Sequence, residues 1–228
     1  MMNRLRQYIY GILLVLAATA CQQESLTPEA TGEGTLVVEN LRRQVEKTDA
    51  LTTKAVDSDL IVDIYAGESV GEGKLLHHYE AGATISSLKL DAGSYTLHTY
   101  NAALNEEATG NGQPIFEKTH AFQIKSGAIN RIDLIVPMIN VGVRLGQHLP
   151  EAFTNYQLAL TQGSREATLT AGQTAYFAAG TAISYTLTGK NADQEEFSLT
   201  GSIDALKQGV IYELQVQLPT QSVSWIMN

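Results

Sequence analysis

The sequence contains an internal repeat, and this repeat constrains the fold more than any other feature. Ser94-Tyr-Thr-Leu97 is followed by Asn101-Ala102, and the same pattern recurs 90 residues later. There it reads Ser184-Tyr-Thr-Leu187, followed by Asn191-Ala192. A match at a fixed period indicates that one structural unit occurs twice.

A second match follows the first in each unit. Lys125-Ser-Gly127 leads into an alternating apolar segment that ends at Pro137, and 82 residues later Lys207-Gln-Gly209 leads into one that ends at Pro219. Two matches in the same order favour a duplication over chance. The change of offset from 90 to 82 predicts that the first unit has a loop eight residues longer, within residues 103–113.

The segments of the repeat have the two-residue hydrophobic period of β-strands. Leu60, Val62 and Ile64 share one face and Asp63 opposes them. Asp91-Ala-Gly93 is typical of a turn, with a positive φ expected at Gly93. No segment has a sustained helical period, so the sequence predicts an all-β protein of two tandem sandwiches. Strands are expected around residues 35–38, 60–65, 75–79, 84–90, 94–100, 116–124 and 130–136.

The N-terminus is typical of an exported protein. Arg4 and Arg6 precede an apolar run over residues 8–20, which as a helix is about 20 Å long against roughly 30 Å of hydrocarbon. The run therefore predicts a signal peptide and no membrane span. It ends at Ala18-Thr-Ala-Cys21, which resembles the lipobox of bacterial lipoproteins, although Leu is usual where Ala18 stands.

Cys21 is the only cysteine in the chain, and an unpaired thiol is unusual in an oxidising compartment. We expect it to carry lipid and to be the membrane partner; an ordinary secretory signal with an incidental cysteine is the alternative. The predicted organisation is a signal peptide (1–20), a lipidated cysteine with a flexible tether (21–34), an N-terminal sandwich (35–138), a C-terminal sandwich (139–219) and an apolar tail (220–228).

The charge is acidic. The formal net charge is −9, and loss of Arg4 and Arg6 with the signal takes it to −11. Such a surface argues against nucleic acid as a partner.

The residues also carry a family resemblance. Gly34-Thr-Leu-Val-Val38, Thr53-Lys-Ala-Val-Asp57 and Leu88-x-Leu-x-x-Gly-x-Tyr-x-Leu97 resemble an uncharacterised lipoprotein family of Bacteroidota. That family is similar in architecture to fimbrillins, the type V pilin and anchor proteins with two transthyretin-like, Ig-like sandwiches. The resemblance covers most of residues 21–219. It implies a structural or adhesive role at the outer membrane and cell surface, with other fimbrial subunits as partners, and it brings no catalytic residues.

Two segments are candidates for assembly. Arg42-Arg43 follows the first expected strand, and the resemblance implies that cleavage after such an arginine removes this strand and lets a neighbour's strand replace it. A dibasic pair on a solvated loop is the alternative. In the tail, Val223, Trp225 and Met227 alternate on one face, as in a strand offered to a partner or packed on its own domain.

The remaining polar groups do not predict an enzyme, a cofactor or a metal. His77 and His78 are adjacent, so on a strand their rings point to opposite faces and cannot share an ion. Asn191-x-Asp193-x-Glu195 begins like a calcium loop but lacks the sharp-turn glycine. Paired acids at 106–107 and 195–196 are typical of solvated loops. A surface glycan-binding module is the alternative function.

Overall fold

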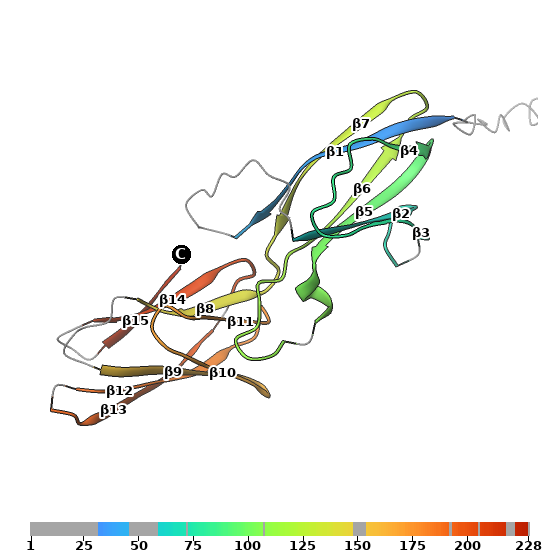
Figure 1. Cartoon of the computed structure of the whole chain (residues 1–228). Coiled ribbons are helices and arrows are strands. Elements are labelled where there is room, and N and C mark those ends of the chain that lie inside the picture. The colour runs from blue at the N-terminus through green and yellow to red at the C-terminus, as the bar shows by residue number, and fades with distance from the viewer. Residues whose placement is uncertain are drawn as a thin grey trace, which may run out of the picture.

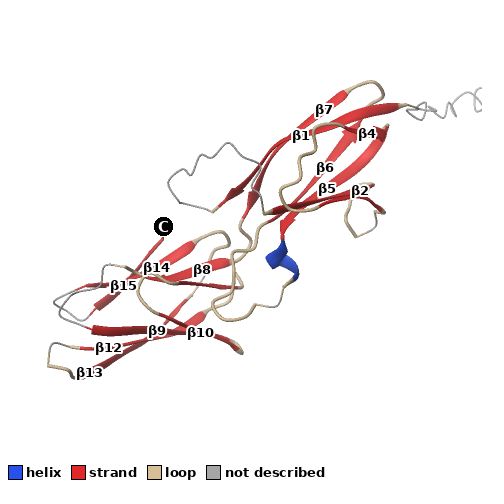
Figure 2. Ribbon diagram, in the orientation of Figure 1, coloured by secondary structure: helices blue, strands red, loops and turns tan. Residues whose placement is uncertain are grey.

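The computed structural model describes residues 32–45, 59–71, 73–106, 108–147, 154–191, 193–204, 206–217 and 222–227. These residues form fifteen strands and one short 3-10 helix, Ala102–Asn105. The strands make two β-sandwiches that follow one another along the chain (Figures 1 and 2), which confirms the all-β fold class. Within the described residues, no helix has the length and apolar character needed to span a membrane.

The first sandwich consists of two sheets. One has the order β4-β1-β7, and the other has the order β3-β2-β5-β6. The strands are β1 (Glu33–Gln44), β2 (Leu60–Ala66), β3 (Leu75–Tyr79), β4 (Leu88–Asp91), β5 (Gly93–Asn101), β6 (Glu117–Ile124) and β7 (Ile129–Pro137).

The second sandwich repeats this plan and adds one strand. Its sheets have the orders β11-β8-β14-β15 and β10-β9-β12-β13. The strands are β8 (Val141–Leu145), β9 (Thr154–Gln162), β10 (Arg165–Leu169), β11 (Thr174–Phe177), β12 (Ile183–Lys190), β13 (Glu196–Ile203), β14 (Ile211–Gln217) and β15 (Ser222–Met227).

Each sandwich encloses its own apolar core. Leu36, Ile64 and Leu97 are buried between the sheets of the first, and Leu158 and Leu187 between those of the second. The alternating residues of each strand supply these side chains, because successive strand residues point to opposite faces. Ile211 of β14 packs against the first core, so the two cores meet where the chain passes from one sandwich to the other.

The repeated Lys-x-Gly turns have equivalent roles. Gly127 and Gly209 have φ of 73° and 80°, a conformation that favours glycine. The Gly127 N–H donates to the carbonyl of Glu33 at 2.8 Å, and the Gly209 N–H donates to that of Asn140 at 2.9 Å. Each turn thereby ties the last strand of its unit beside the first, and β1–β7 and β8–β14 are parallel pairs.

The expected positive φ at Gly93 is wrong. Gly93 begins β5 opposite Ile124 and is not among the glycines with positive φ. The reason is topological, since β4 and β5 lie in different sheets. The chain crosses from one sheet to the other at Asp91–Gly93 and does not close a tight hairpin there.

Candidate functional site

The first strand, β1, occupies the centre of its sheet. It pairs antiparallel with β4 at its start and parallel with β7 along almost its whole length. Its side chains Leu36, Val38 and Leu41 are 0%, 5% and 2% exposed. Without β1, an apolar groove would open between β4 and β7.

Arg42 and Arg43 lie inside β1 and not after it. The strand continues beyond residue 38 because β7 goes on pairing with it after an irregularity between Val38 and Asn40. Register places Arg42 opposite Ile135 and Arg43 opposite Val136. A protease would therefore have to detach the end of β1 from β7 before it could cleave there.

Both arginines are held by acidic side chains. The Arg42 Nη2 lies 3.3 Å from Asp133 Oδ1 on β7, and the Arg43 Nη1 donates to Asp59 Oδ2 at 2.8 Å. The Arg43 guanidinium also lies over the Phe116 ring, 5.3 Å from its centroid. The Arg42 side chain is 47% exposed and that of Arg43 31%, so water screens both ion pairs and each contributes little to stability.

The C-terminal segment forms β15 on the edge of the second sandwich. It pairs antiparallel with β14, with Trp225 opposite Leu214 and Val223 opposite Val216. Met227, the last described residue, is 47% exposed. Cys21 and the tether to residue 31 lie outside the described residues.

A cluster of titratable side chains lies on the outer face of the β3-β2-β5-β6 sheet. Asp63 on β2 stands opposite His78 of β3 and His98 of β5, and it is only 5% exposed. One oxygen of Asp63 lies 2.6 Å from His78 Nδ1, and the other accepts a hydrogen bond from the Tyr100 hydroxyl at 3.1 Å. His98 lies 2.9 Å from Glu117 and stacks on Tyr100.

These contacts change two pKa values. The hydrogen bond to Asp63 raises the pKa of His78 above its ordinary value. Burial, followed by the hydrogen bond to Asp63, raises the pKa of Tyr100 to about 12. The second ring nitrogen of His78 lies 3.3 Å from Glu80. Both ring nitrogens of His78 therefore face carboxylates of the chain, and these contacts join β2, β3 and β5 on the outer face of the sheet.

Other candidate ligands are also engaged within the chain. His77 stacks on Tyr79 while His78 contacts Asp63, so the neighbouring histidines point apart. Asn191 accepts the N–H of Glu195 at 2.8 Å and donates to its carboxylate at 3.0 Å, which closes the hairpin upon itself. In the described part of the chain, no three His, Cys, Asp or Glu side chains gather as a metal site.

Sequence reasoning missed two features. Asp63 was expected only to oppose the apolar face, and its burial under Tyr100 and His78 depends on pairing across three strands. Arg165 had no distinguishing signal at all, because its surroundings come from a loop more than fifty residues earlier, which it contacts at Ala108 and Gly110.

Several solved structures are similar in fold. A fimbrilin from Porphyromonas gingivalis is 10% identical, with 87% of this chain and 97% of that one covered and a TM-score of 0.47. The tip fimbrial protein Mfa3 from the same organism, with a C-terminal truncation, is 9% identical, with 86% and 99% covered and a TM-score of 0.49. A fimbrial assembly protein from Parabacteroides distasonis is 8% identical, with 87% and 95% covered and a TM-score of 0.49.

At these identities and TM-scores, the similarities by themselves assign no function. No curated protein matches the sequence. The sequence profile of a domain of unknown function, DUF4493, matches residues 32–225, which span both sandwiches from β1 to β15. This match confirms the resemblance to a family of unknown function, and the chain belongs to the DUF4493 family.

Proposed function

We propose that this protein is a structural or adhesive lipoprotein of the bacterial cell surface, a subunit or anchor of fimbria-like fibres held to the outer membrane by lipid on Cys21. The observation that carries the proposal is the place of β1, a central strand with a dibasic pair at its C-terminal end. A strand in this position is replaceable by one from another subunit, because ladder hydrogen bonds accept any backbone and only alternate side chains must fit.

Replacement needs a driving force, and the burial of the apolar side chains of β1 provides it. Burial of a Leu or Val side chain contributes about 1.5–3 kcal/mol, so loss of Leu36, Val38 and Leu41 exposes a groove that favours capture of a new apolar strand. Cleavage after Arg42 or Arg43 would release these three residues together with Cys21. An anchored molecule therefore keeps β1, and a polymerising one loses both β1 and the lipid.

The donor strand in this proposal is β15. Its alternating residues Val223, Trp225 and Met227 match the spacing that a groove between two strands requires. β15 lies at a sheet edge, where it has one strand neighbour among the described residues. Its release would break one ladder, whereas release of β1 breaks two.

The test is intact mass and size-exclusion chromatography of the protein isolated from its native envelope, before and after treatment with a trypsin-like protease. A diacylated Cys21 with an intact β1 and a monomeric profile is expected of an anchor. Loss of everything through Arg42 or Arg43 together with a ladder of higher species is expected of a polymerising subunit. A protein without lipid mass and without assembly would contradict the proposal.

A double variant, Arg42→Gln with Arg43→Gln, separates cleavage from other effects. It should stay uncleaved and should not polymerise. Arg131→Gln is the matched control, because Arg131 is also a strand arginine with an exposed ion pair, to Glu39 at 2.6 Å. This control should be processed and should assemble like the unaltered protein.

Glycan binding on a flat aromatic platform has less support. The exposed large hydrophobic side chains among the described residues are aliphatic or Met, whereas sugar platforms use aromatic rings. Tyr100, on the outer face of the first sandwich, is only 8% exposed.

A further inference from the structure

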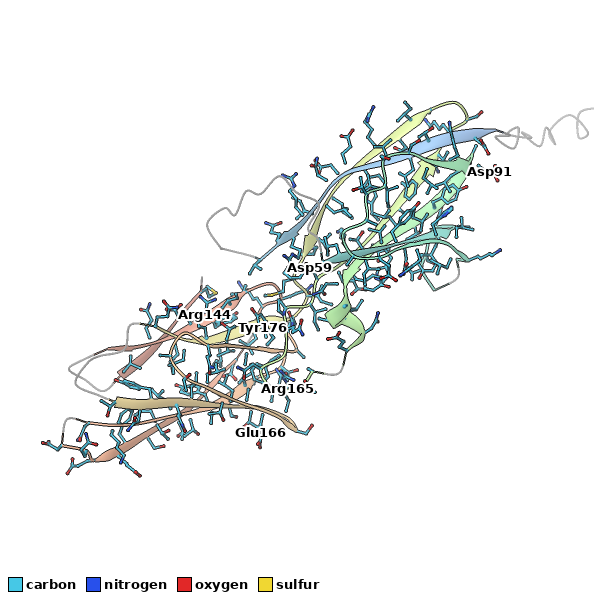
Figure 3. The ribbon with its side chains drawn as sticks, in the orientation of Figure 1. Asp59, Asp91, Arg144, Arg165, Glu166 and Tyr176 are labelled. Carbon is cyan, nitrogen blue, oxygen red and sulfur yellow. The ribbon has the colours of Figure 1, made fainter. Side chains whose placement is uncertain are left out.

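A cleft lies at the junction of the two sandwiches. It has a volume of about 400 Å³, which suits a small ligand. One wall is the loop between β5 and β6, and the other comes from the second sandwich, at Arg165 and the segment Tyr176–Ala178. Figure 3 shows Arg165 and Tyr176 at the end of the second sandwich that faces the first.

Arg165 is incompletely paired within this cleft. Its Nη1 donates to the carbonyl of Ala108 at 2.8 Å, and its guanidinium stacks on the Phe177 ring at 5.1 Å. Its Nη2 has only a long contact, 3.5 Å, with the carbonyl of Gly110. Its Nε is buried and has no hydrogen-bond partner. Each terminal nitrogen carries two N–H groups, and the contacts with Ala108 and Gly110 use one of each. The remaining N–H of Nη1 and of Nη2 can donate to a carboxylate.

The charge of Arg165 is also unpaired. The chain is acidic, with a net charge of −9, yet Arg165 contacts only carbonyl groups and a ring. It is the one arginine in the described residues without a carboxylate partner. The others pair with acids: Arg42 with Asp133, Arg43 with Asp59, Arg131 with Glu39 and Arg144 with Glu213.

The opposite wall offers polar groups that are equally uncommitted. Thr109, Asn111 and Gln113 line the cleft, and their side chains make no hydrogen bond within the described part of the protein. Between them, Gly112 has a φ of 66° and approaches so closely that an added Cβ would lie 2.5 Å from Arg165 Nη2. Glu106 is the other charged residue of the lining and disfavours anions at its end of the cleft.

We infer that this cleft binds a small acidic saccharide, a hexuronate or a short glycan ending in one. The carboxylate would accept hydrogen bonds from the remaining terminal N–H groups of Arg165, and the ring hydroxyls would meet Thr109, Asn111 and Gln113. A cation for the carboxylate, hydroxyl and amide groups for the sugar, and a cleft of this volume are the elements that such a ligand requires. The site is independent of strand exchange and does not rest on it.

Ligand-observed NMR titration of the full mature chain with glucuronate tests the inference, with glucose and acetate as reference probes. We expect millimolar binding of glucuronate, at least about tenfold weaker binding of glucose, and weaker binding of acetate. The binding should weaken as salt is added, because the site is partly open to solvent. If glucose bound as tightly as glucuronate, Arg165 would not recognise the carboxylate. If acetate bound as tightly as glucuronate, the cleft would not recognise the sugar ring.

Variants assign the binding to the cleft. Arg165→Gln should weaken glucuronate binding at least about tenfold, and Arg144→Gln, which removes an arginine of the same sandwich outside the cleft, should leave it unchanged. Glu106→Gln should strengthen it a few fold, because a like charge is removed. Glu106 is exposed, so this second variant keeps its meaning even if Arg165→Gln disturbs the junction. If neither Arg165→Gln nor Glu106→Gln changed the affinity for glucuronate, the ligand would bind outside the cleft.

Discussion

The two sandwiches have the same strand arrangement and differ in the length of one loop and in one added edge strand. Strands β1 to β7 correspond to β8 to β14 in sheet position, with the same parallel pairing of first and last strands. Even the loop closures agree. Asn101 Oδ1 accepts the N–H of Phe116 in the first sandwich, and Asn191 Oδ1 accepts that of Glu195 in the second.

The loops that these asparagines close differ in length. The first closure spans 15 residues and the second spans 4, so the first loop is eleven residues longer. The connection after the next strand is instead longer in the second unit. Lys125 follows Ile124 directly, whereas three residues separate Ile203 from Lys207. The eight-residue difference expected from the repeat offsets is the net of these two changes.

The longer loop, between β5 and β6, makes contacts between the two sandwiches. The Asn140 side chain accepts the N–H of Ile115 at 3.0 Å and donates to the carbonyl of Gln113 at 2.8 Å. The Tyr176 N–H donates to the carbonyl of Asn111 at 2.8 Å. In this molecule, the longer loop of the first unit forms the surface against the second unit, and the second unit differs instead by the added edge strand β15.

The largest expected contrast is between the two terminal strands. Deletion of residues 33–44 removes three buried side chains, worth about 5–9 kcal/mol, a large part of a typical domain's stability of about 5–15 kcal/mol. Deletion of residues 222–227 removes an edge strand and should leave both cores closed. Hydrogen exchange of backbone amides in β7 and β14 measures the effect. Loss of protection should be confined to the first sandwich for the first deletion and to the edge of β14 for the second.

The outcome that would break this contrast is equal loss of protection. If both deletions unfolded their sandwiches, the edge strand β15 would be as necessary for stability as β1, and the central position of β1 would not distinguish it.

A smaller contrast concerns the equivalent asparagines. Asn101 is 8% exposed, and its side chain bonds both Phe116 N–H and the carbonyl of Pro114 at 2.8 Å. Asn101→Ala should cost about 2–4 kcal/mol, because the buried N–H of Phe116 and the partly buried carbonyl of Pro114 lose their partners. Asn191→Ala should cost about 0.5–1.5 kcal/mol, because water can replace its bonds. Urea unfolding measures both free energies, and equal costs would show that burial at the junction does not set them.

The sequence predicted what depends on local pattern. The two-residue period predicted most strands, because it is a property of neighbouring residues. The repeat predicted two sandwiches, because it can be read by comparing short segments of the sequence without knowing which strands pair. The extent of β1 could not be predicted, since Arg42 and Arg43 are in a strand only through pairing with β7, about ninety residues away. The cleft could not be predicted either, because Arg165 meets its neighbours Ala108 and Gly110 across the two units.

The smallest expected effect concerns pH. Register equates Asp63 and His98 of the first sandwich with Gln157 and Thr188 of the second, so this cross-strand pair has no titratable counterpart there. The raised pKa of His78 means that its protonated form stabilises the folded state at pH below its unfolded value, about 6.5. This contribution is lost as pH rises through the folded-state pKa.

The substitution His78→Asn should therefore lower the free energy of unfolding at mildly acidic pH and change it little at mildly alkaline pH. The difference is small, because the His78 side chain is 43% exposed and solvent screens its charge. Urea unfolding on both sides of neutral pH measures it, with Gln157→Asn in the second sandwich as the control that alters no titratable group. If the loss were the same at every pH, the contact between His78 and Asp63 would act through packing alone, and the two outer faces would differ in shape and not in charge.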